Sequence, residues 1–341
     1  MKREKEVEGK VRVIIMMVMM MVMMGCNSGG RDPEKVFLSE MVNLGKGFLD
    51  VFVSFGDMIT GTLGIKADTK KSEIGKYFSD IEKTMNSVKS KLNAVVAENG
   101  DYPKVKEVVG QFISGKLDKI VEGAKEAAKG AIGGDAIGNA VKNEDAKPAE
   151  VASINALVKG IKEIVDVVLK KGEGNPDSTK TGETEQKSIG KLLGKGAHDG
   201  TEIEAAAASA SIGAVSGADI LQAISSSGEA SGEPTIQLAK NAAEIAIAKL
   251  DQSKTLDTAK KDAVIAAGIA LRAMAKAGKF AAKTDEEKSA HAVNGVVASA
   301  VNKVLSTLVI AIRNKVDEGL KEINKALGEI KKGEAFEAKI N

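Results

Sequence analysis

The sequence predicts an all-α fold, and three observations support this prediction. Along several long segments the apolar residues recur at gaps of three and four positions, which is the spacing of one face of a helix. No segment shows the strict alternation of apolar and polar residues that is typical of strands. The 341 residues include five prolines, so long uninterrupted helices are possible. We therefore expect helices packed side by side.

Residues 1–25 are expected to be a signal peptide. Five basic residues are followed by the apolar run from Val13 to Met24, and then by Gly25 and Cys26. A helix of this run would rise about 18 Å, which is too short to cross a hydrocarbon core of about 30 Å. A charged start, a short apolar run and a small residue before the break are the marks of a secretory signal that is removed.

Cys26 is the predicted lipidation site, with signal cleavage between Gly25 and Cys26. It is the only cysteine of the chain, so it cannot form an internal disulfide, and it stands where the apolar run stops. We expect a diacylglycerol on its sulfur and an acyl chain on the amine that cleavage frees. Two or more acyl chains hold a protein durably on a membrane. The alternative is an unmodified cysteine beside an ordinary signal peptide, since Met24 occupies a position where lipoproteins usually have a small residue.

The composition argues against several classes of function. Five of the 49 basic and three of the 47 acidic residues lie in residues 1–25, which leaves 44 of each and a formal charge of zero. A neutral chain has no electrostatic footprint for nucleic acid, so no nucleic-acid partner is expected. Aromatic residues make up 3% of the chain and tryptophan is absent. Because aromatic side chains usually line small-molecule pockets, this composition also does not favour an enzyme.

After a tether over residues 26–33, residues 34–341 are expected to form one helical domain. Asp32-Pro33 is typical of a helix start, and the apolar residues of segment 37–59 share one helix face. A second helix is predicted over residues 68–97, where gaps of four and three alternate without interruption, as in helices that pack along a partner helix. Its apolar residues are Ile74, Phe78, Ile81, Met85, Val88, Leu92 and Val95.

Five more segments carry helical spacing. A third helix is predicted over residues 104–129, and a fourth, opened by a proline, over residues 148–171. Near the C-terminus, helices are predicted over residues 236–250, 258–283 and 289–332. The last of these would be about 66 Å long at the usual helical rise.

Three segments with little apolar periodicity are expected to be flexible loops, over about residues 133–147, 172–187 and 197–235. No apolar side chain lies between Gly172 and Lys187, so this segment cannot stabilise its own ordering and is expected to be exposed. Residues 197–235 are rich in Ala, Ser and Gly, and short helices joined by flexible turns are expected there.

No set of residues predicts catalysis or metal binding. His198 precedes an aspartate, but glycines on both sides of the pair predict an exposed turn, and His291 is expected on the surface. With two histidines, and the cysteine assigned to lipid, a zinc site lacks ligands. Segment 110–117 imitates a phosphate-binding loop, but Leu117 stands where that motif needs Ser or Thr, and a helical pattern surrounds it. We expect no catalytic residue, no metal and no cofactor.

Four blocks of sequence resemble one family. They are Cys26-Asn-Ser-Gly-Gly30, Phe37–Lys91, Ile265–Phe280 and Leu308–Asp317, which together cover roughly half of the mature chain. The chain resembles the variable large proteins of relapsing-fever Borrelia, which are similar to the variable surface antigen of Lyme disease spirochaetes. The resemblance implies an elongated, mostly helical lipoprotein on the outer face of the cell outer membrane. Both terminal helices would lie near the membrane and the loops far from it.

The resemblance also implies a function. In that family one variant is expressed at a time, and switching among variants evades antibody. The expected partners are the outer membrane, through the lipid on Cys26, and host antibodies, and sequence differences among variants are expected in the three loop segments. The alternative is a host-factor-binding adhesin or a complement-binding protein, whose partners would be host serum or matrix proteins. The oligomeric state stays open.

Overall fold

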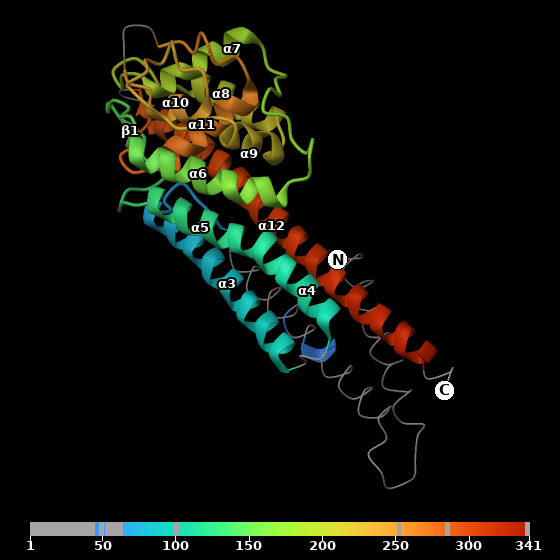
Figure 1. Cartoon of the computed structure of the whole chain (residues 1–341). Helices are drawn as coiled ribbons and strands as arrows, with labels where there is room; N and C mark the ends of the chain where they lie inside the picture. The colour runs from blue at the N-terminus through green and yellow to red at the C-terminus, as the bar shows by residue number, and fades with distance from the viewer. Residues whose placement is uncertain are drawn as a thin grey trace.

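The computed structural model describes residues 45–47, 51, 64–98, 102–250, 254–283 and 287–337. These residues form a helical molecule in two parts, which we call the stem and the head (Figure 1). The predicted all-α class is confirmed. The expected signal peptide, the tether and most of the helix expected over residues 37–59 lie outside the described residues.

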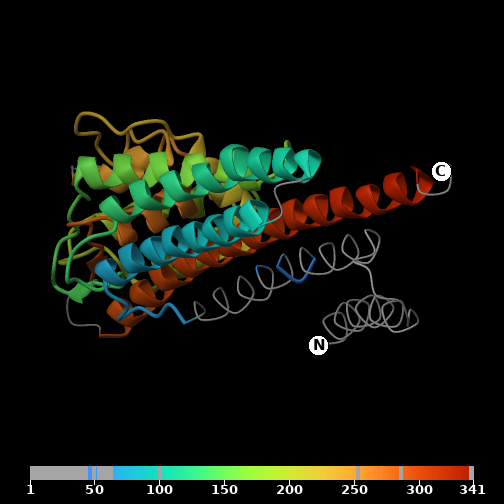
Figure 2. The ribbon, with the colours of Figure 1, turned by 60° about the horizontal axis from the view of Figure 1, so that its bottom comes forward.

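Apart from the short helical pieces at residues 45–47 and 51, the described part of the stem consists of three helical rods. α3 spans Lys71–Glu98, α4 spans Pro103–Phe112 and continues through a π-helical turn, Ile113–Leu117, into α5, Asp118–Gly130, and α12 spans Glu287–Glu337. α12 has 51 residues and is therefore about 76 Å long. Figure 2 shows α12 leaving the head and running along the stem, where it packs beside α4.

The sequence predicted the stem helices well. The seven apolar positions of α3, from Ile74 to Val95, are all buried. The hydroxyl group of Tyr77 in α3 donates to the carbonyl oxygen of Leu305 at 2.9 Å, which joins α3 to α12. The helix predicted over residues 104–129 is also confirmed, with the π-helical turn inside it, so the segment that imitates a phosphate-binding loop is part of a helical rod.

The head is built around α11, Asp262–Met274, of whose 13 residues all but Val264 are fully buried. Around it lie α6, Val151–Val168, α8, Glu202–Ala214, α9, Gly217–Ser225, α10, Ala242–Ile247, and the N-terminal half of α12. A short helix, α7, Glu183–Ser188, and a 3-10 turn, Ile189–Leu193, pack against α8.

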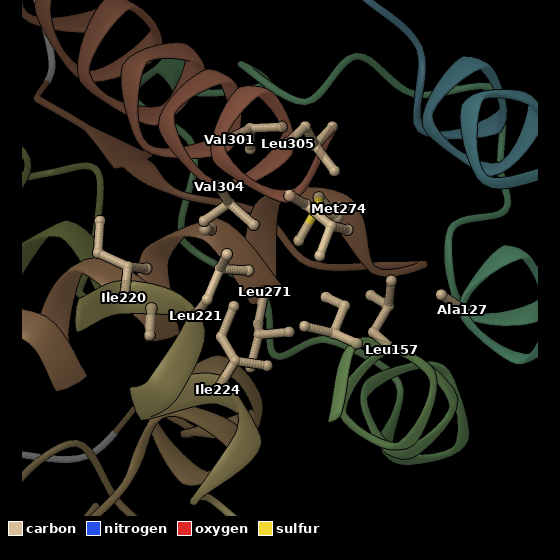
Figure 3. Packing of buried hydrophobic residues seen from close by; sticks show 14 of the residues in the cluster. Ala127, Leu157, Ile220, Leu221, Ile224, Leu271, Met274, Val301, Val304 and Leu305 are labelled. Carbon is tan, nitrogen blue, oxygen red and sulfur yellow. The ribbon is translucent and has the colours of Figure 1, made fainter. Parts of the chain in front are cut away.

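Side chains from four helices meet in the core of the head. In Figure 3, Leu271 and Met274 of α11 lie between α6, α9 and α12. The labelled neighbours are Leu157, Ile220, Leu221, Ile224, Val301, Val304 and Leu305. Among the described residues, Glu287–Glu329 of α12 is the one straight helical stretch long and apolar enough to cross a membrane, but half of its most apolar part is buried within the protein. It serves here as a core helix.

Two helices near the C-terminus are shorter than predicted. Segment 236–250 is helical over α10 alone, and segment 258–283 over α11 alone. The chain turns after α11, where Ala277 has a φ of 65°, and the Nζ of Lys71 donates to the carbonyl oxygens of Ala275 at 2.6 Å and Gly278 at 2.8 Å. These tertiary contacts end the helix where the local pattern would let it continue.

α6 also starts later than predicted, at Val151 rather than at Pro148. The backbone N–H of Ala149 donates to the carbonyl oxygen of Ala246, and that of Glu150 donates to Lys276. Because these groups bond to the α10 and α11 region, the residues before Val151 are held outside the helix.

A two-residue parallel pairing joins the two halves of the sequence. β1, Val141–Lys142, pairs with β2, Ala281–Ala282. The sequence carries no signal for it, because two residues are too few to show an alternating pattern.

Segment 133–147 is non-helical, as predicted, but it is packed into the molecule. Ile137 and Ala140 are buried. The backbone N–H of Ile137 donates to the carbonyl oxygen of Thr69 at 2.8 Å. The amide side chain of Asn294 in α12 bonds to both the backbone N–H and the carbonyl oxygen of Ala140, at 2.8 and 3.0 Å. This segment therefore connects the start of α3 to α12.

Candidate antigenic surface

Residues Gly172–Gly182 form an exposed segment that we call the strap. It leaves the end of α6 and runs over one side of the head to α7 (Figure 1). Exposed side chains belong to Glu173, Asn175, Asp177, Thr179 and Lys180, whereas Gly174, Pro176, Ser178 and Thr181 are partly buried. The predicted exposed loop is confirmed over the strap.

The loop prediction is wrong for residues 183–187, which belong to α7. This helix has no apolar stripe that a sequence pattern could reveal. Its one buried residue is Gln186, whose Nε2 donates to two strap atoms, the hydroxyl oxygen of Thr179 at 2.6 Å and the carbonyl oxygen of Thr181 at 3.2 Å.

A buried carboxylate holds the end of the strap. Asp262, the first residue of α11, accepts hydrogen bonds from the backbone N–H groups of Lys180 at 2.6 Å and Thr181 at 2.9 Å, and from the Thr181 hydroxyl at 2.5 Å. Ser211 of α8 and Gln186 of α7 donate to it at 2.8 and 3.2 Å. Burial raises the pKa of this carboxyl group, but the hydrogen bonds outweigh burial and hold its pKa below the ordinary value.

Side chains of α9 hold the start of the strap. The Oδ1 of Asp219 accepts from the backbone N–H of Asn175 at 2.7 Å. The Nε2 of Gln222 donates to the carbonyl oxygen of Glu173 at 3.1 Å. Both contacts reach the backbone of the strap, so they do not depend on which side chains the strap carries.

Segment 197–235 is mostly helical and packed. The short helices expected there are present as α8 and α9, which meet at an angle of 96°. Each begins with a capping box, Thr201 with Glu204 in α8 and Ser216 with Asp219 in α9. Most of this segment is therefore part of the head core.

Residues 226–234 of that segment are largely exposed, with Ser227 and Ala230 buried. There the amide side chain of Asn155 in α6 bonds to both the backbone N–H and the carbonyl oxygen of Ala230, at 2.6 and 3.1 Å. The carbonyl oxygen of Pro234 accepts from the backbone N–H of Lys249 at 2.9 Å. This stretch, like the strap, is held through its backbone.

Three basic side chains bind the ends of helices in the head. Lys71 bonds to carbonyl groups just beyond α11, as described above. The fully buried Arg272 donates from one nitrogen to the carbonyl oxygens of Ala246 at 3.1 Å and Ala248 at 3.0 Å, at the end of α10. Lys303 donates to a carbonyl oxygen in the last turn of α8 at 2.7 Å. Carbonyl groups at a helix C-terminus lack helical partners and carry partial negative charge, so they bind cations.

Burial changes the ionisation of two of these groups. Burial lowers the pKa of Lys71 from 10.5 to about 7, with the charge of Asp135 acting in the opposite direction. Burial also lowers the pKa of Arg272, although a guanidinium keeps its charge at neutral pH. The guanidinium carbon lies 5.9 Å from the centre of the Phe280 ring, which places this cation over an aromatic face.

The residues weighed for chemistry do not come together. His198 and His291 are both exposed, as predicted. The buried carboxylate of Asp199 accepts from the Nζ of Lys254 at 2.6 Å and from the backbone N–H of Lys195 at 2.8 Å. Within the described ranges, no group of three or more His, Cys, Asp or Glu residues could hold a metal ion. The predicted lipidation and cleavage residues, Cys26 and Gly25, lie outside those ranges.

Three charged residues, Arg272, Lys71 and Asp262, organise the head but were not predicted from the sequence. Arg272 carries a usable signal, because it is the one charged residue in the apolar run 263–275, and a charge in such a run implies buried partners. Lys71 carries none, since it lies in a polar segment beside another lysine. Asp262 follows two lysines and has the sequence context of a solvated face.

The chain enters the described part of the stem at the end far from the head. A Cβ atom built on Gly47 would lie 2.7 Å from a methyl carbon of Val95, which is close to the end of α3. Gly47 follows Cys26 by 21 residues, which can span at most about 75 Å.

Comparison with known proteins identifies similar chains. The Borrelia lipoprotein family matches residues 48–327. The chain is 58% identical to variable large protein 4 of Borrelia hermsii over 327 residues, covering 93% of each chain. It is 40% identical to variable large protein 19 of the same species over 344 residues, covering 92% of each. Among solved structures, the Lyme disease variable surface antigen VlsE of Borrelia burgdorferi matches with a TM-score of 0.76 and 35% identity, covering 86% of this chain and 100% of VlsE.

Proposed function

The chain belongs to the Borrelia lipoprotein family, and we propose that it is an antigenically variable surface lipoprotein that serves immune evasion by antigen switching. Its relatives are variable large proteins and a variable surface antigen. The observation that carries the proposal is the head, where exposed polar segments are attached to a buried helical core through their backbone atoms. Such a surface can change its side chains while the core stays the same.

The second part of the proposal concerns the anchor. Cys26 would be lipidated after the leader is cut off, and the lipid would hold the protein on the outer face of the outer membrane. Gly47 lies near the stem end, so the stem would be nearest to the membrane and the head farthest from it. Mass spectrometry of the native protein tests this part, and we expect a triacylated Cys26 at the mature N-terminus. An intact Met1 or an unmodified Cys26 would refute it.

The antigenic function is tested on intact bacteria. Serum raised against this protein should bind cells that express it and should bind poorly to cells that express variable large protein 19 instead. That relative is a suitable control because it is 40% identical over nearly its whole length, so it belongs to the same family but differs from this chain at most aligned positions. Equal binding to both cells, or no binding to intact cells, would contradict the proposal.

A further inference from the structure

We propose that Lys71 and the turn Ala275–Gly278 form a latch between the stem and the head, which opens as one unit and whose opening depends on the protonation of Lys71. The latch lies where α3, a stem helix, begins beside the end of α11, the central helix of the head. This inference goes beyond the proposed function, because it concerns how the two parts of the molecule are coupled and requires neither a lipid nor an antibody.

The first argument is the set of contacts that the Lys71 side chain makes. This side chain is fully buried, although it belongs to the first residue of α3. Its Nζ donates to the carbonyl oxygens of Ala275 at 2.6 Å and Gly278 at 2.8 Å, and the carbonyl oxygen of Arg272 lies 3.4 Å away. All three carbonyl groups lie at or beyond the end of α11. One side chain of the stem therefore binds the turn that ends the central helix of the head.

The second argument is that the turn is unfavourable by itself. Ala277 has a φ of 65°, in the left-handed region that costs free energy for a residue with a side chain. The Nδ2 of Asn139 donates to the carbonyl oxygen of Gly278 at 2.7 Å, but its Oδ1 is buried and accepts no hydrogen bond from the described residues. A buried acceptor without a partner is destabilising. The contacts to Lys71 therefore hold a turn whose own conformation favours release.

The third argument is the charge environment of Lys71. The pKa of Lys71 falls from 10.5 to about 7, chiefly because the group is buried, while the carboxylate of Asp135 raises it and the guanidinium of Arg272 lowers it. Further charged side chains of this region form ion pairs: Lys276 with Glu150, Lys279 with Glu144 and Lys142 with Glu287. On α3 itself, the Glu73 carboxylate accepts from the backbone N–H of Lys70. The closed latch therefore holds the proton of Lys71 weakly.

Opening of the latch is thereby coupled to uptake of a proton. It would return Lys71 to water, where its pKa has the ordinary value of 10.5. Between pH 7 and this value the closed latch contains a neutral amine and the open latch an ammonium group, so opening takes up one proton. The neutral amine keeps two donors, which match Ala275 and Gly278. The fraction of open molecules should therefore fall about tenfold per pH unit above pH 7 and stay constant below it.

The test is hydrogen exchange of backbone amides in the full chain, followed by mass spectrometry from about pH 6 to about pH 9. The reporters of the latch are amides that bond across the turn, those of Lys147, Glu150 and Lys279. The amide of Lys180 in the strap, which donates to Asp262, is the remote comparison. Hydroxide catalyses amide exchange, so a site with a fixed opening equilibrium exchanges about tenfold faster for each pH unit.

We expect the latch amides to accelerate with pH up to about pH 7 and to exchange at a nearly constant rate above it, because fewer open molecules then offset the faster chemistry. They should exchange at least about tenfold faster than the amides inside α11, which means that the latch opens while the head stays folded. The amide of Lys180 should accelerate over the whole range. The isotope envelope should stay single, which shows that the latch recloses faster than it exchanges.

Two variants identify the titrating group. Lys71→Met removes it, so the latch amides of this variant should accelerate over the whole range. Asp135→Asn removes the charge that raises the pKa of Lys71, so the region of constant rate should begin at a lower pH. Because Asp135 is exposed, this variant decides the question if Lys71→Met does not fold. Asp177→Asn is the matched control, since Asp177 is also exposed and its charge is not among those that shift the pKa of Lys71.

Several outcomes would overturn the inference. The latch amides of the parent protein accelerate over the whole pH range, or they exchange no faster than those of α11. The isotope envelope splits in two above pH 7, so that slow reclosing explains the constant rate. Lys71→Met keeps the break near pH 7, or Asp135→Asn leaves it where Asp177→Asn does. None of these results bears on the antigenic function, which is tested separately on intact cells.

Discussion

Lys71 is fully buried and donates hydrogen bonds to backbone carbonyl oxygens beyond α11. A neutral amine can still donate two hydrogen bonds, so these contacts survive when the proton is lost. The cost of burying the charge is what lowers the pKa of this group to about 7. At the residue scale the joint between stem and head therefore depends on a lysine that is easily deprotonated.

The protein should become more stable as the pH rises above neutrality. In the unfolded chain Lys71 keeps its proton up to a pKa near 10.5, whereas in the folded protein it releases the proton near 7. Between these values the unfolded state binds more protons, so the free energy of unfolding should increase, by about 5 kcal/mol in total for this group. Below pH 7 both states are protonated and this contribution is absent. Urea unfolding at a series of pH values measures the slope.

The control for this prediction is Lys71→Met, which keeps a long side chain and removes the titrating group. The variant should show a flatter dependence of the free energy of unfolding on pH than the parent protein. If the free energy of unfolding changes with pH equally in the variant and the parent, the pH dependence arises from other groups and the prediction for Lys71 is wrong.

At the scale of elements, α5 and α6 approach each other through glycines. A Cβ atom on Gly160 would lie 2.3 Å from the backbone nitrogen of Ala127 and 2.4 Å from the carbonyl oxygen of Gly123. A Cβ atom on Gly130 would lie 2.3 Å from the carbonyl oxygen of Ser153. The two helix backbones are therefore in contact along this face, and even a methyl group would force them apart.

Gly160→Ala should destabilise the protein by about 3 kcal/mol, since overpacking a helix contact that has backbone on the other side leaves no side chain to move aside. Gly110→Ala in α4 is the matched control, because no atom lies within 4 Å of the position of its Cβ. That change should stabilise the protein by about 0.5–1 kcal/mol through helix propensity. Thermal unfolding followed by circular dichroism measures both. Equal effects of the two substitutions would contradict the packing argument.

Among the helices, some could be located from the sequence and the ends of others could not. α3 and α12 bury one apolar face over many turns, so the spacing of their apolar residues located them well. α10 and α11 are rich in alanine and buried on nearly all sides, so no stripe marks their ends. Arg272 and Lys71 bind the carbonyl groups at those ends, and Lys71 lies about 200 residues earlier in the chain. A local pattern cannot contain such contacts.

The candidate antigenic surface was also only partly predictable from local sequence patterns. Polarity alone predicted that the strap is exposed, and this is confirmed. Its fixed path could not be predicted, because the carboxylate that holds Lys180 lies 82 residues later in the chain. Segment 133–147 was expected to be a flexible loop with few packing constraints, but Ile137 and Ala140 are buried in it. Its packing is decided by Asn294 in α12, again far along the sequence.

At the scale of the whole molecule, the two ends of the structure differ in what they carry. At the stem end lie the last described turns of α12, the start of α4 and the end of α3. There Glu329 of α12 forms an ion pair with Lys104 of α4. The head carries the strap and the exposed stretch 226–234. If a lipid on Cys26 holds the stem end at the membrane, the exposed segments of the head would lie where antibodies arrive first, and neighbouring molecules at high surface density would shield the stem.

This arrangement predicts a gradient of accessibility on living cells. Because Cys26 is the only cysteine and would be blocked by lipid, an introduced cysteine can report its own position. Asp177→Cys in the strap and Lys325→Cys near the stem end both replace exposed residues. A bulky polyethylene-glycol maleimide should label the strap cysteine faster on intact bacteria, since the reagent must pass between molecules to reach the stem. In detergent-solubilised protein the two rates should be similar, which controls for intrinsic reactivity. Faster labelling of Lys325→Cys on cells would mean that the head, not the stem, faces the membrane.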